Sequence, residues 1–266
     1  MKISILGCGW LGLPLGEFLV KNGHAVKGST TSESKIALLS AVNIEPFLLQ
    51  FTPKIESENI TQFLDSEVLI ICIPPRAGKL GEDYHVQQIQ SLLEYLPSSS
   101  IKSIIYTSST SVYPDLSREV LEEDSIIENH ALVKVENLLK TLPQNVTILR
   151  CGGLMGGERI PAKYFQGKTI NTGKIPVNYV HQDDVIQIIS MILEKGFWNE
   201  TFNVVSPEHP VREEIYLKNC EDFGFAKPIF EEAVEPIPFK IISPQKLISR
   251  TGYIFKYANP LDFKYL

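Results

Sequence analysis

The chain has 266 residues, of which 44% are hydrophobic and 21% are charged, an ordinary composition for a globular protein. This length suffices for one large domain, or for one domain with an appendage, and for a full core without disulfides or metals. Thirty-one acidic and 25 basic residues give a net charge of −6. That balance argues against a broad surface for nucleic acid, which needs a basic patch.

The cysteines and the amino terminus point to a reducing compartment. Cys8, Cys72, Cys151 and Cys220 lie far apart and form no Cys-x-x-Cys pair or Cys/His ligand spacing. We expect buried thiols and no metal site. No cleavable signal sequence opens the chain, and no apolar run approaches the roughly 18 residues of a membrane span. These features predict a cytoplasmic protein that binds neither membranes nor nucleic acid.

Short apolar runs alternate with helical patterns over the first 205 residues. In chain order, strands are expected at residues 2–6, 25–29, 45–51, 68–73, 103–107, 146–150 and 201–205. Helices are expected at residues 11–20, from 35 onward, and at 83–95, 131–140 and 184–193. The run 68–73 is apolar on both faces, as in a strand covered by helices on each side. The order predicts an α/β fold, a Rossmann-type doubly wound parallel sheet.

The pattern changes after Arg150. Residues 151–157 contain four glycines, and the stretch to residue 180 is loop-like. From residue 207 onward the chain is rich in Pro, Glu and aromatic residues, without clear strand–helix alternation. We therefore expect a dinucleotide-binding domain at 1–205, with 152–178 contributing to a cap, and a small carboxy-terminal substrate lobe at 206–266. So small a lobe favours a small substrate, or none.

A glycine-rich turn follows the first expected strand. Gly7, Gly9 and Gly12, with Trp10 and Leu11 between the last two, match G-x-G-x-x-G at the start of a helix. In this setting the first glycine allows a tight turn, the second a close approach of the pyrophosphate, and the third close packing of helix on sheet. The amino end of the helix then offers N–H groups to the phosphates. The turn predicts a dinucleotide site.

The residues after the second strand bear on which dinucleotide binds. An acidic residue there usually holds the ribose of NAD. Here the chain has Thr30, Thr31 and Ser32, and no acid before Glu33. Hydroxyls and the nearby Lys35 suit a 2′-phosphate, which favours NADP over NAD, although Glu33 opposes this. The alternative is that these residues only cap the next helix.

Several segments together suggest a family. They follow in the order seen in extended short-chain dehydrogenase/reductases: the glycine motif, Asn22-Gly23-His24, residues 107–113 (TSSTSVY), Ile148-Leu149-Arg150 and residues 180–184 (VHQDD). The chain resembles the NAD-dependent epimerase/dehydratase type, the nucleoside-diphosphate-sugar epimerases. Residues 73–76 (IPPR), the glycine loop at 150–159 and residues 206–210 (SPEHP) are similar to the atypical YeeZ-like subgroup.

The resemblance implies where the cofactor and a catalytic hydroxyl lie. The cofactor would also touch Pro74, Pro75, Thr107 and Ser108, and the loop after Thr107 would lie beside the nicotinamide. Ser109 falls where such enzymes carry a catalytic hydroxyl, which stabilises charge on a substrate oxygen. The alternative is a polar loop at the end of a strand.

The Tyr-x-x-x-Lys pair of that family is missing from residues 125–140. In the family the lysine lowers the pKa of the tyrosine, so that the phenol can transfer a proton. Alignment on Lys134 puts His130 in the place of the tyrosine. Alignment on Glu136, the family's glutamate, puts Glu128 and Leu132 in the two positions.

His130 and Tyr113 are two candidates for the proton donor. His130 titrates near neutral pH and is an acid/base candidate, but a histidine at a helix start is also typical of a solvated face. Tyr113 is another possible donor and is usually structural in this loop. Substrate-assisted chemistry at Ser109 is a third route.

Later polar residues are weaker hypotheses. Arg150 ends a strand at the carboxyl edge, where open α/β sheets bind ligands, and Arg159, Lys163 and Asn178 suit an anionic substrate. The alternative for each is ordinary surface polarity. Asp183 or Asp184 is expected to cap the helix after it, with His181 held by the same turn.

The sequence as a whole predicts an NAD(P)-binding, epimerase/dehydratase-like oxidoreductase for a small carbonyl or sugar-like substrate. The alternative is a catalytically silent NAD(P)-binding sensor or interaction module, which the missing Tyr-x-x-x-Lys favours. The expected partner is a small molecule, and a homodimer is possible.

Overall fold

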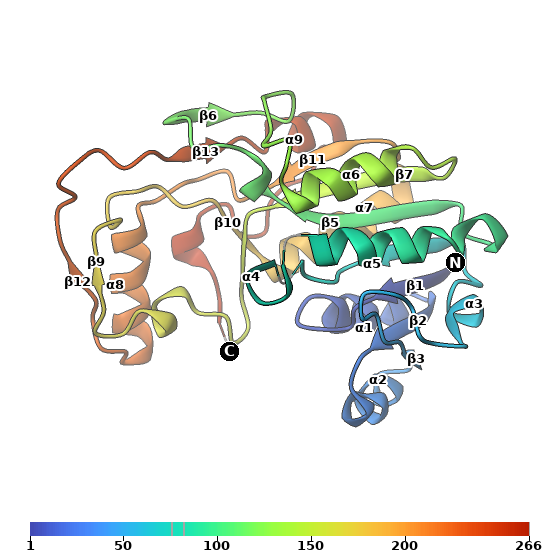
Figure 1. Cartoon of the computed structure of the whole chain (residues 1–266). Helices are drawn as coiled ribbons and strands as arrows, with labels where there is room; N and C mark the ends of the chain where they lie inside the picture. Colours follow the sequence, from blue (N-terminus) through green and yellow to red (C-terminus); the bar gives the residue numbers. More distant parts are fainter. Residues whose placement is uncertain (76, 82, 266) are drawn as a thin grey trace. The chain divides into compact units, whose positions relative to one another are not determined.

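The structure, a computed structural model, describes residues 1–75, 77–81 and 83–265. Its centre is a seven-stranded sheet of order β11-β7-β5-β4-β1-β2-β3, which confirms the predicted fold class (Figure 1). The strands are β1 (Lys2–Leu6), β2 (Ala25–Thr30), β3 (Glu45–Leu48), β4 (Val68–Ile71), β5 (Ser103–Ser109), β7 (Asn145–Cys151) and β11 (Thr201–Val204). β1 pairs in parallel with β2 and with β4, and β4 is fully buried.

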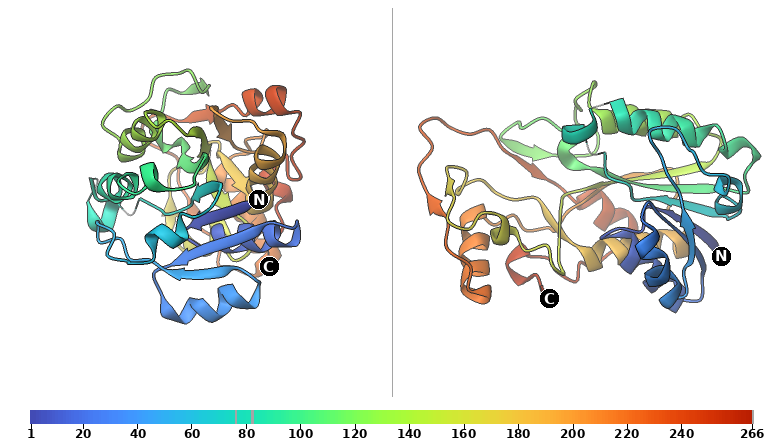
Figure 2. Two further views of the ribbon diagram at one scale, coloured as in Figure 1. Left: turned by 90° about the vertical axis from the view of Figure 1, so that its right-hand side faces the viewer. Right: turned by 60° about the horizontal axis from the view of Figure 1, so that its bottom comes forward.

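Helices cover both faces of this sheet. They are α1 (Gly12–Lys21), α2 (Ile36–Ala41), α3 (Ile60–Phe63), α4 (Ala77–Leu80), α5 (Asp83–Leu93), α6 (Ala131–Lys140) and α7 (Gln182–Lys195). β2 and β3 lie on one side of β1, and β4, β5, β7 and β11 lie on the other. Because crossovers between parallel strands are right-handed, the helices of these two halves lie on opposite faces of the sheet. Figure 2 shows α5 and α6 side by side on one face and α1 on the other. The strand order therefore reverses between β1 and β4, where such sheets bind ligands.

The chain divides into two compact units. The first is Met1–Val112, Ile127–Leu149 and Ile189–Thr201, and the second is Tyr113–Ile126, Arg150–Ile188 and the chain from Phe202 onward. This division differs from a boundary at residue 205, because strand pairs in the second unit join distant segments. β6 (Arg118–Val120) pairs with β13 (Lys240–Ile242), β8 (Gly153–Met155) with β10 (Tyr179–His181), and β9 (Thr169–Ile170) with β12 (Ile229–Phe230).

The second unit also contains helices that the sequence pattern did not predict. α8 (Arg212–Phe223) and α9 (Gln245–Thr251) lie in the region without clear alternation. α8 buries only a few apolar side chains, among them Ile215, Tyr216 and Cys220, so its periodicity is weak. These side chains pack on Ile170 and Val177 and form the core of this part.

The turn before α7 differs from the expectation of an aspartate cap. His181 stands at the start of the helix, and its Nδ1 accepts the N–H of Asp183 at 3.2 Å. Asp184 is fully buried and accepts hydrogen bonds from Tyr253 Oη and from the N–H of Lys256, each at 2.7 Å. Asp184 therefore fixes the carboxy-terminal segment, and His181 caps the helix.

None of the four cysteines forms a disulfide with another described residue, and three of them are buried. Within the described ranges, no cluster of three or more His, Cys, Asp or Glu side chains suits a metal ion. Among the same residues, no helix has the length and apolar character to span a bilayer.

A buried histidine lies under the sheet of the first unit. His85 on α5 is fully buried, and its Nε2 lies 2.9 Å from the hydroxyl of Tyr106 on β5. Burial lowers the pKa of His85 to about 4. The imidazole is therefore neutral in the folded protein down to mildly acidic pH.

We predict that His85 makes the folded state sensitive to acid. In the unfolded chain the pKa of His85 is near 6.5, so the residue binds a proton below that pH. In the folded chain it binds the proton only near pH 4. The stability should therefore fall by up to about 1.4 kcal/mol per pH unit in this window. Urea unfolding at pH 7 and pH 5 measures the loss. His85→Gln should show a smaller loss, and equal losses in the two proteins would contradict the assignment.

Candidate functional site

The glycine turn between β1 and α1 depends on two close backbone contacts. Gly7 has φ +99°, and a Cβ on it would lie 2.8 Å from Cγ2 of Ile73. A Cβ on Gly12 would lie 2.2 Å from the carbonyl oxygen of Gly7. Gly9 is different, because among the described residues, its own chain neighbours aside, no atom lies within 4 Å of its Cβ position. The first and third glycines are thus required by the fold, and the second borders open space.

Ser29 on β2 holds this turn in place. Its buried hydroxyl accepts the N–H of Gly7 at 2.8 Å, and its carbonyl accepts the N–H of Cys8 at 2.8 Å. The sequence pattern gave Ser29 no such role, since serines at strand ends are common. The positioned turn leads into α1 through half-buried Trp10 and buried Leu11.

The amino end of α1 suits an anion. α1 has no side-chain cap at Leu11 and no acidic residue in its first turn. The first N–H groups of a helix lack partners within the helix and carry partial positive charge. A phosphate group is a fitting partner for such an end. A dinucleotide pyrophosphate therefore fits this turn, with Gly9 leaving it room.

The end of β2 presents hydroxyls and no carboxylate. Oγ1 of buried Thr30 accepts the N–H of Ser32 at 3.1 Å, while Thr31 is exposed. Ser32 precedes a short 3-10 helix, η1 (Glu33–Lys35), yet its side chain makes no cap hydrogen bond there. Burial raises the pKa of Cys8 in the glycine turn to about 12, and the charge of Lys35 opposes that rise. Lys35 itself is exposed, in the short 3-10 helix that follows β2.

The ends of β4 and β5 lie next to the glycine turn. Ile73 borders Gly7, Pro74 is exposed and Pro75 half-buried, while Arg76 lies outside the described residues. Thr107 Oγ1 donates to the carbonyl of Ile71 at 2.9 Å, which ties the two strand ends together.

Ser108 faces α6. Its buried hydroxyl donates to Oε1 of Glu136 at 2.6 Å, and Glu136 is only 1% exposed. Side chains alternate along a strand, so Thr107 and Ser109 lie on the other side of β5. Ser108 thus anchors α6 to the strand, a role that the resemblance did not assign to it.

Ser109, Ser111 and His130 form one chain of hydrogen bonds. Ser109 Oγ accepts the N–H of Ser111 at 3.1 Å. Ser111 Oγ lies 3.3 Å from Nε2 of His130, and Nδ1 of His130 accepts the N–H of Leu132 at 3.1 Å. His130 is therefore the cap of α6. Because Nδ1 uses its lone pair in the cap, the hydrogen-bond network assigns the proton to Nε2.

This tautomer changes the acid/base expectation for His130. Nε2 carries a proton and donates to Ser111, so it has no lone pair with which to act as a base there. Protonation of Nδ1 would break the cap of α6. The geometry gives His130 the role of a helix cap and hydrogen-bond donor.

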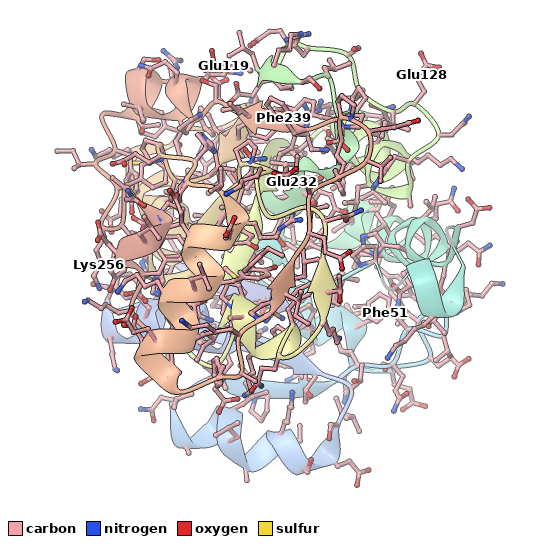
Figure 3. All side chains as sticks on the ribbon, turned by 90° about the vertical axis from the view of Figure 1, so that its left-hand side faces the viewer. Phe51, Glu119, Glu128, Glu232, Phe239 and Lys256 are labelled. Carbon is pink, nitrogen blue, oxygen red and sulfur yellow. The ribbon has the colours of Figure 1, made fainter. Side chains whose placement is uncertain are left out.

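No Tyr-x-x-x-Lys equivalent is assembled on α6 within the described residues. Lys134 Nζ pairs with Asp83 at 3.1 Å on the surface. Glu128, the alternative tyrosine position, is exposed and points outward (Figure 3), and Leu132 is buried.

Tyr113 and Arg150 are buried together in the second unit. Tyr113 is 1% exposed and Arg150 is 3% exposed. The Tyr113 hydroxyl donates to Asn203 Oδ1 at 2.8 Å and accepts from Arg150 Nη1 at 2.6 Å. Arg150 also donates to the carbonyl of Glu122 at 3.2 Å. This burial opposes the expected proton-donor and substrate-binding roles, because both groups are occupied inside the unit.

The other three residues expected to meet an anionic substrate differ from one another. Asn178 Nδ2 donates to the carbonyl of Lys240 at 2.9 Å, and its Oδ1 accepts the N–H of Ile242 at 2.7 Å, so its amide is occupied by β13. Arg159 is half-buried, and burial lowers the pKa of its guanidinium. Lys163 is exposed. Of these two cations, the partly desolvated guanidinium of Arg159 should bind an anion more strongly than the exposed ammonium of Lys163.

One curated relative covers almost the whole chain. Protein YeeZ of Escherichia coli K12 is 32% identical over 267 residues, which is 98% of this chain and 97% of the relative. The chain belongs to the YeeZ family. No family model matches the chain.

Solved structures share the fold of this YeeZ-family chain at low identity. UDP-glucuronic acid 4-epimerase of Bacillus cereus, solved with UDP-glucuronic acid and NAD, has a TM-score of 0.80 at 20% identity and covers 99% of this chain and 96% of its own. UDP-glucose 4-epimerase of Thermotoga maritima, solved with UDP-glucose, has a TM-score of 0.77 at 18% identity over 96% of this chain and 94% of its own. A functionally unknown protein of Silicibacter pomeroyi has a TM-score of 0.76 at 18% identity, over 98% and 95%.

We predict that Tyr113→Phe destabilises the protein without weakening dinucleotide binding. The change leaves buried polar groups of Arg150 and Asn203 without the shared hydroxyl, which should cost about 1–3 kcal/mol. Chemical unfolding measures the loss. Tyr164→Phe is the control, because Tyr164 is 56% exposed and should be neutral. A neutral Tyr113→Phe would contradict the structural role.

Proposed function

We propose that the chain binds a nicotinamide dinucleotide at the glycine turn of its first unit and is an epimerase/dehydratase-like oxidoreductase for a carbonyl or sugar-like substrate. The main support is the uncapped amino end of α1 beside the open space at Gly9. The names of the fold neighbours agree, since they include sugar-nucleotide epimerases solved with NAD.

The first unit has a residue for each part of such a ligand. The turn at Gly7–Gly12 would hold the pyrophosphate, and Thr30–Ser32 the ribose of the adenosine half. Pro74 and Thr107 would border the nicotinamide half. When bound, the dinucleotide supplies or accepts a hydride, and Ser109 would hold a substrate oxygen beside it.

NADP is the dinucleotide that we propose this site prefers. The end of β2 carries hydroxyls at Thr30, Thr31 and Ser32 where NAD sites carry an acid. Lys35 is exposed shortly after these hydroxyls, in η1. Its ammonium would pair with a 2′-phosphate.

Substrate binding by the second unit is also part of the proposal. Arg159 suits an anionic group such as a phosphate or a carboxylate, as in the sugar nucleotides of the fold neighbours. A homodimer and a cytoplasmic location remain predictions.

We predict that Gly9→Ala abolishes dinucleotide binding and leaves the fold intact. The new methyl group would meet no atom of the described residues beyond its chain neighbours, and it would fill the space left for the pyrophosphate. Trp10 fluorescence measures binding of NADPH and NADH, with Trp198→Phe in the background because the chain has 2 tryptophans.

Gly12→Ala is the matched comparison. Its methyl group would collide with the Gly7 carbonyl, so this variant should lose about 1–3 kcal/mol of stability. Unchanged dinucleotide affinity in a folded Gly9→Ala variant would contradict the proposed site.

We predict that Lys35→Ala weakens NADPH binding about tenfold, the effect of losing one hydrogen bond to a charged group. NADH affinity should change less than about twofold, because NADH has no 2′-phosphate for the lysine to hold. Calorimetry at constant ionic strength measures both. Lys102→Ala is the control, since Lys102 is exposed on the same unit. Equal losses for the two cofactors would contradict the preference for NADP.

Because the Tyr-x-x-x-Lys pair is missing, we retain one alternative function. A chain that binds the dinucleotide and turns over no substrate in a broad carbonyl and sugar-nucleotide screen would be a silent sensor or interaction module. Lys134 supports this alternative, because it pairs with Asp83 on the surface.

A further inference from the structure

We infer that Ser111, oriented by His130, forms with Ser109 a two-hydroxyl site for a substrate oxygen, in place of the missing tyrosine and lysine. The inference rests on the proposed function and deepens it. The ligand class is a carbonyl or hydroxyl oxygen of a sugar-like compound. Nothing in the resemblance assigns Ser111 or its bond to His130.

The direction of each hydrogen bond carries the inference. The N–H of Leu132 donates to His130 Nδ1 at 3.1 Å, which leaves the proton of the neutral imidazole on Nε2. Nε2–H then donates to Ser111 Oγ, 3.3 Å away. Since Ser111 accepts this bond, its own hydroxyl proton points to another acceptor.

The hydroxyl oxygen of Ser109 also accepts a hydrogen bond. Its Oγ accepts the N–H of Ser111 at 3.1 Å, which orients its hydroxyl proton away from the loop backbone. In the described part of the chain, neither hydroxyl proton has a protein acceptor. Ser111 is exposed and Ser109 half-buried, so a ligand can reach each hydroxyl. Because the N–H of Ser111 bonds to Ser109 Oγ, the two residues lie side by side, and we propose that their hydroxyls share one ligand oxygen.

The site binds and orients an oxygen, and the imidazole transfers no proton. Loss of the Nε2 proton from a neutral imidazole would leave an anion, and gain of a proton at Nδ1 would break the cap. Ser111 is thus the residue that touches the substrate, and His130 is a positioning residue. Hydroxyl donors keep their protons over the whole neutral range, unlike a tyrosine that depends on a lysine.

Nitrogen NMR of ¹⁵N-histidine-labelled protein tests the arrangement. His130 should show the Nε2–H tautomer, with its signals assigned by their loss in His130→Asn. UDP-glucose, UDP-glucuronic acid and dihydroxyacetone, each added with and without NADPH, are the probes. At least one of them should shift the Nε2 signal, and Ser111→Ala should weaken its binding about tenfold.

His130→Asn separates positioning from folding. Asn is a good helix cap, so this variant should keep the thermal midpoint and the NADPH affinity, yet lose the same share of probe binding as Ser111→Ala. Ser98→Ala, at an exposed serine of the same unit, should leave probe binding unchanged.

Three results would overturn the inference: an Nδ1–H tautomer at His130, no Nε2 shift with any probe, or full probe affinity in Ser111→Ala. Because NADPH affinity is measured separately, failure of dinucleotide binding would identify failure of the proposed function instead.

Discussion

The contact between the start of α1 and the carbonyl of Gly7 is the constraint on which the site depends. Only a hydrogen atom fits between them, because a Cβ on Gly12 would stand 2.2 Å from that oxygen. The contact brings the amino end of α1 against the edge of the sheet at its switch point, between β1 and β4. Ser29 then fixes the turn from the neighbouring strand. The open space at Gly9 exists because these contacts hold the turn around it.

The first unit was largely predictable from the sequence, and the reason is burial. Strands such as β4 are covered on both faces, so they are unbroken apolar runs in the sequence. The glycine turn is recognisable because few backbone geometries require glycines at this spacing. The second unit was not predictable. Its short strands pair across distant segments, as β6 does with β13, and α8 buries too few apolar residues to give a periodic pattern.

The side chains of the site show the same limit. The sequence placed Arg150 at the carboxyl edge of the sheet but not its burial against Tyr113, because the partners come from distant parts of the chain. His130 was a candidate from its residue type and from its alignment with the family's tyrosine, whereas its tautomer follows from a hydrogen bond to the backbone of α6. Glu136 was used to align the chain with the family, but its hydrogen bond with Ser108 could not be predicted from the sequence spacing. Local patterns indicate which residues are available, and the fold decides what each one binds.

Isothermal titration calorimetry of the unaltered chain with NADPH and with NADH measures dinucleotide binding at the glycine turn. We expect one binding site per chain, with NADPH the tighter ligand. It also predicts that ADP-ribose, which carries the pyrophosphate without the nicotinamide, competes for the same site. Absence of binding by both dinucleotides to the folded chain would contradict the account.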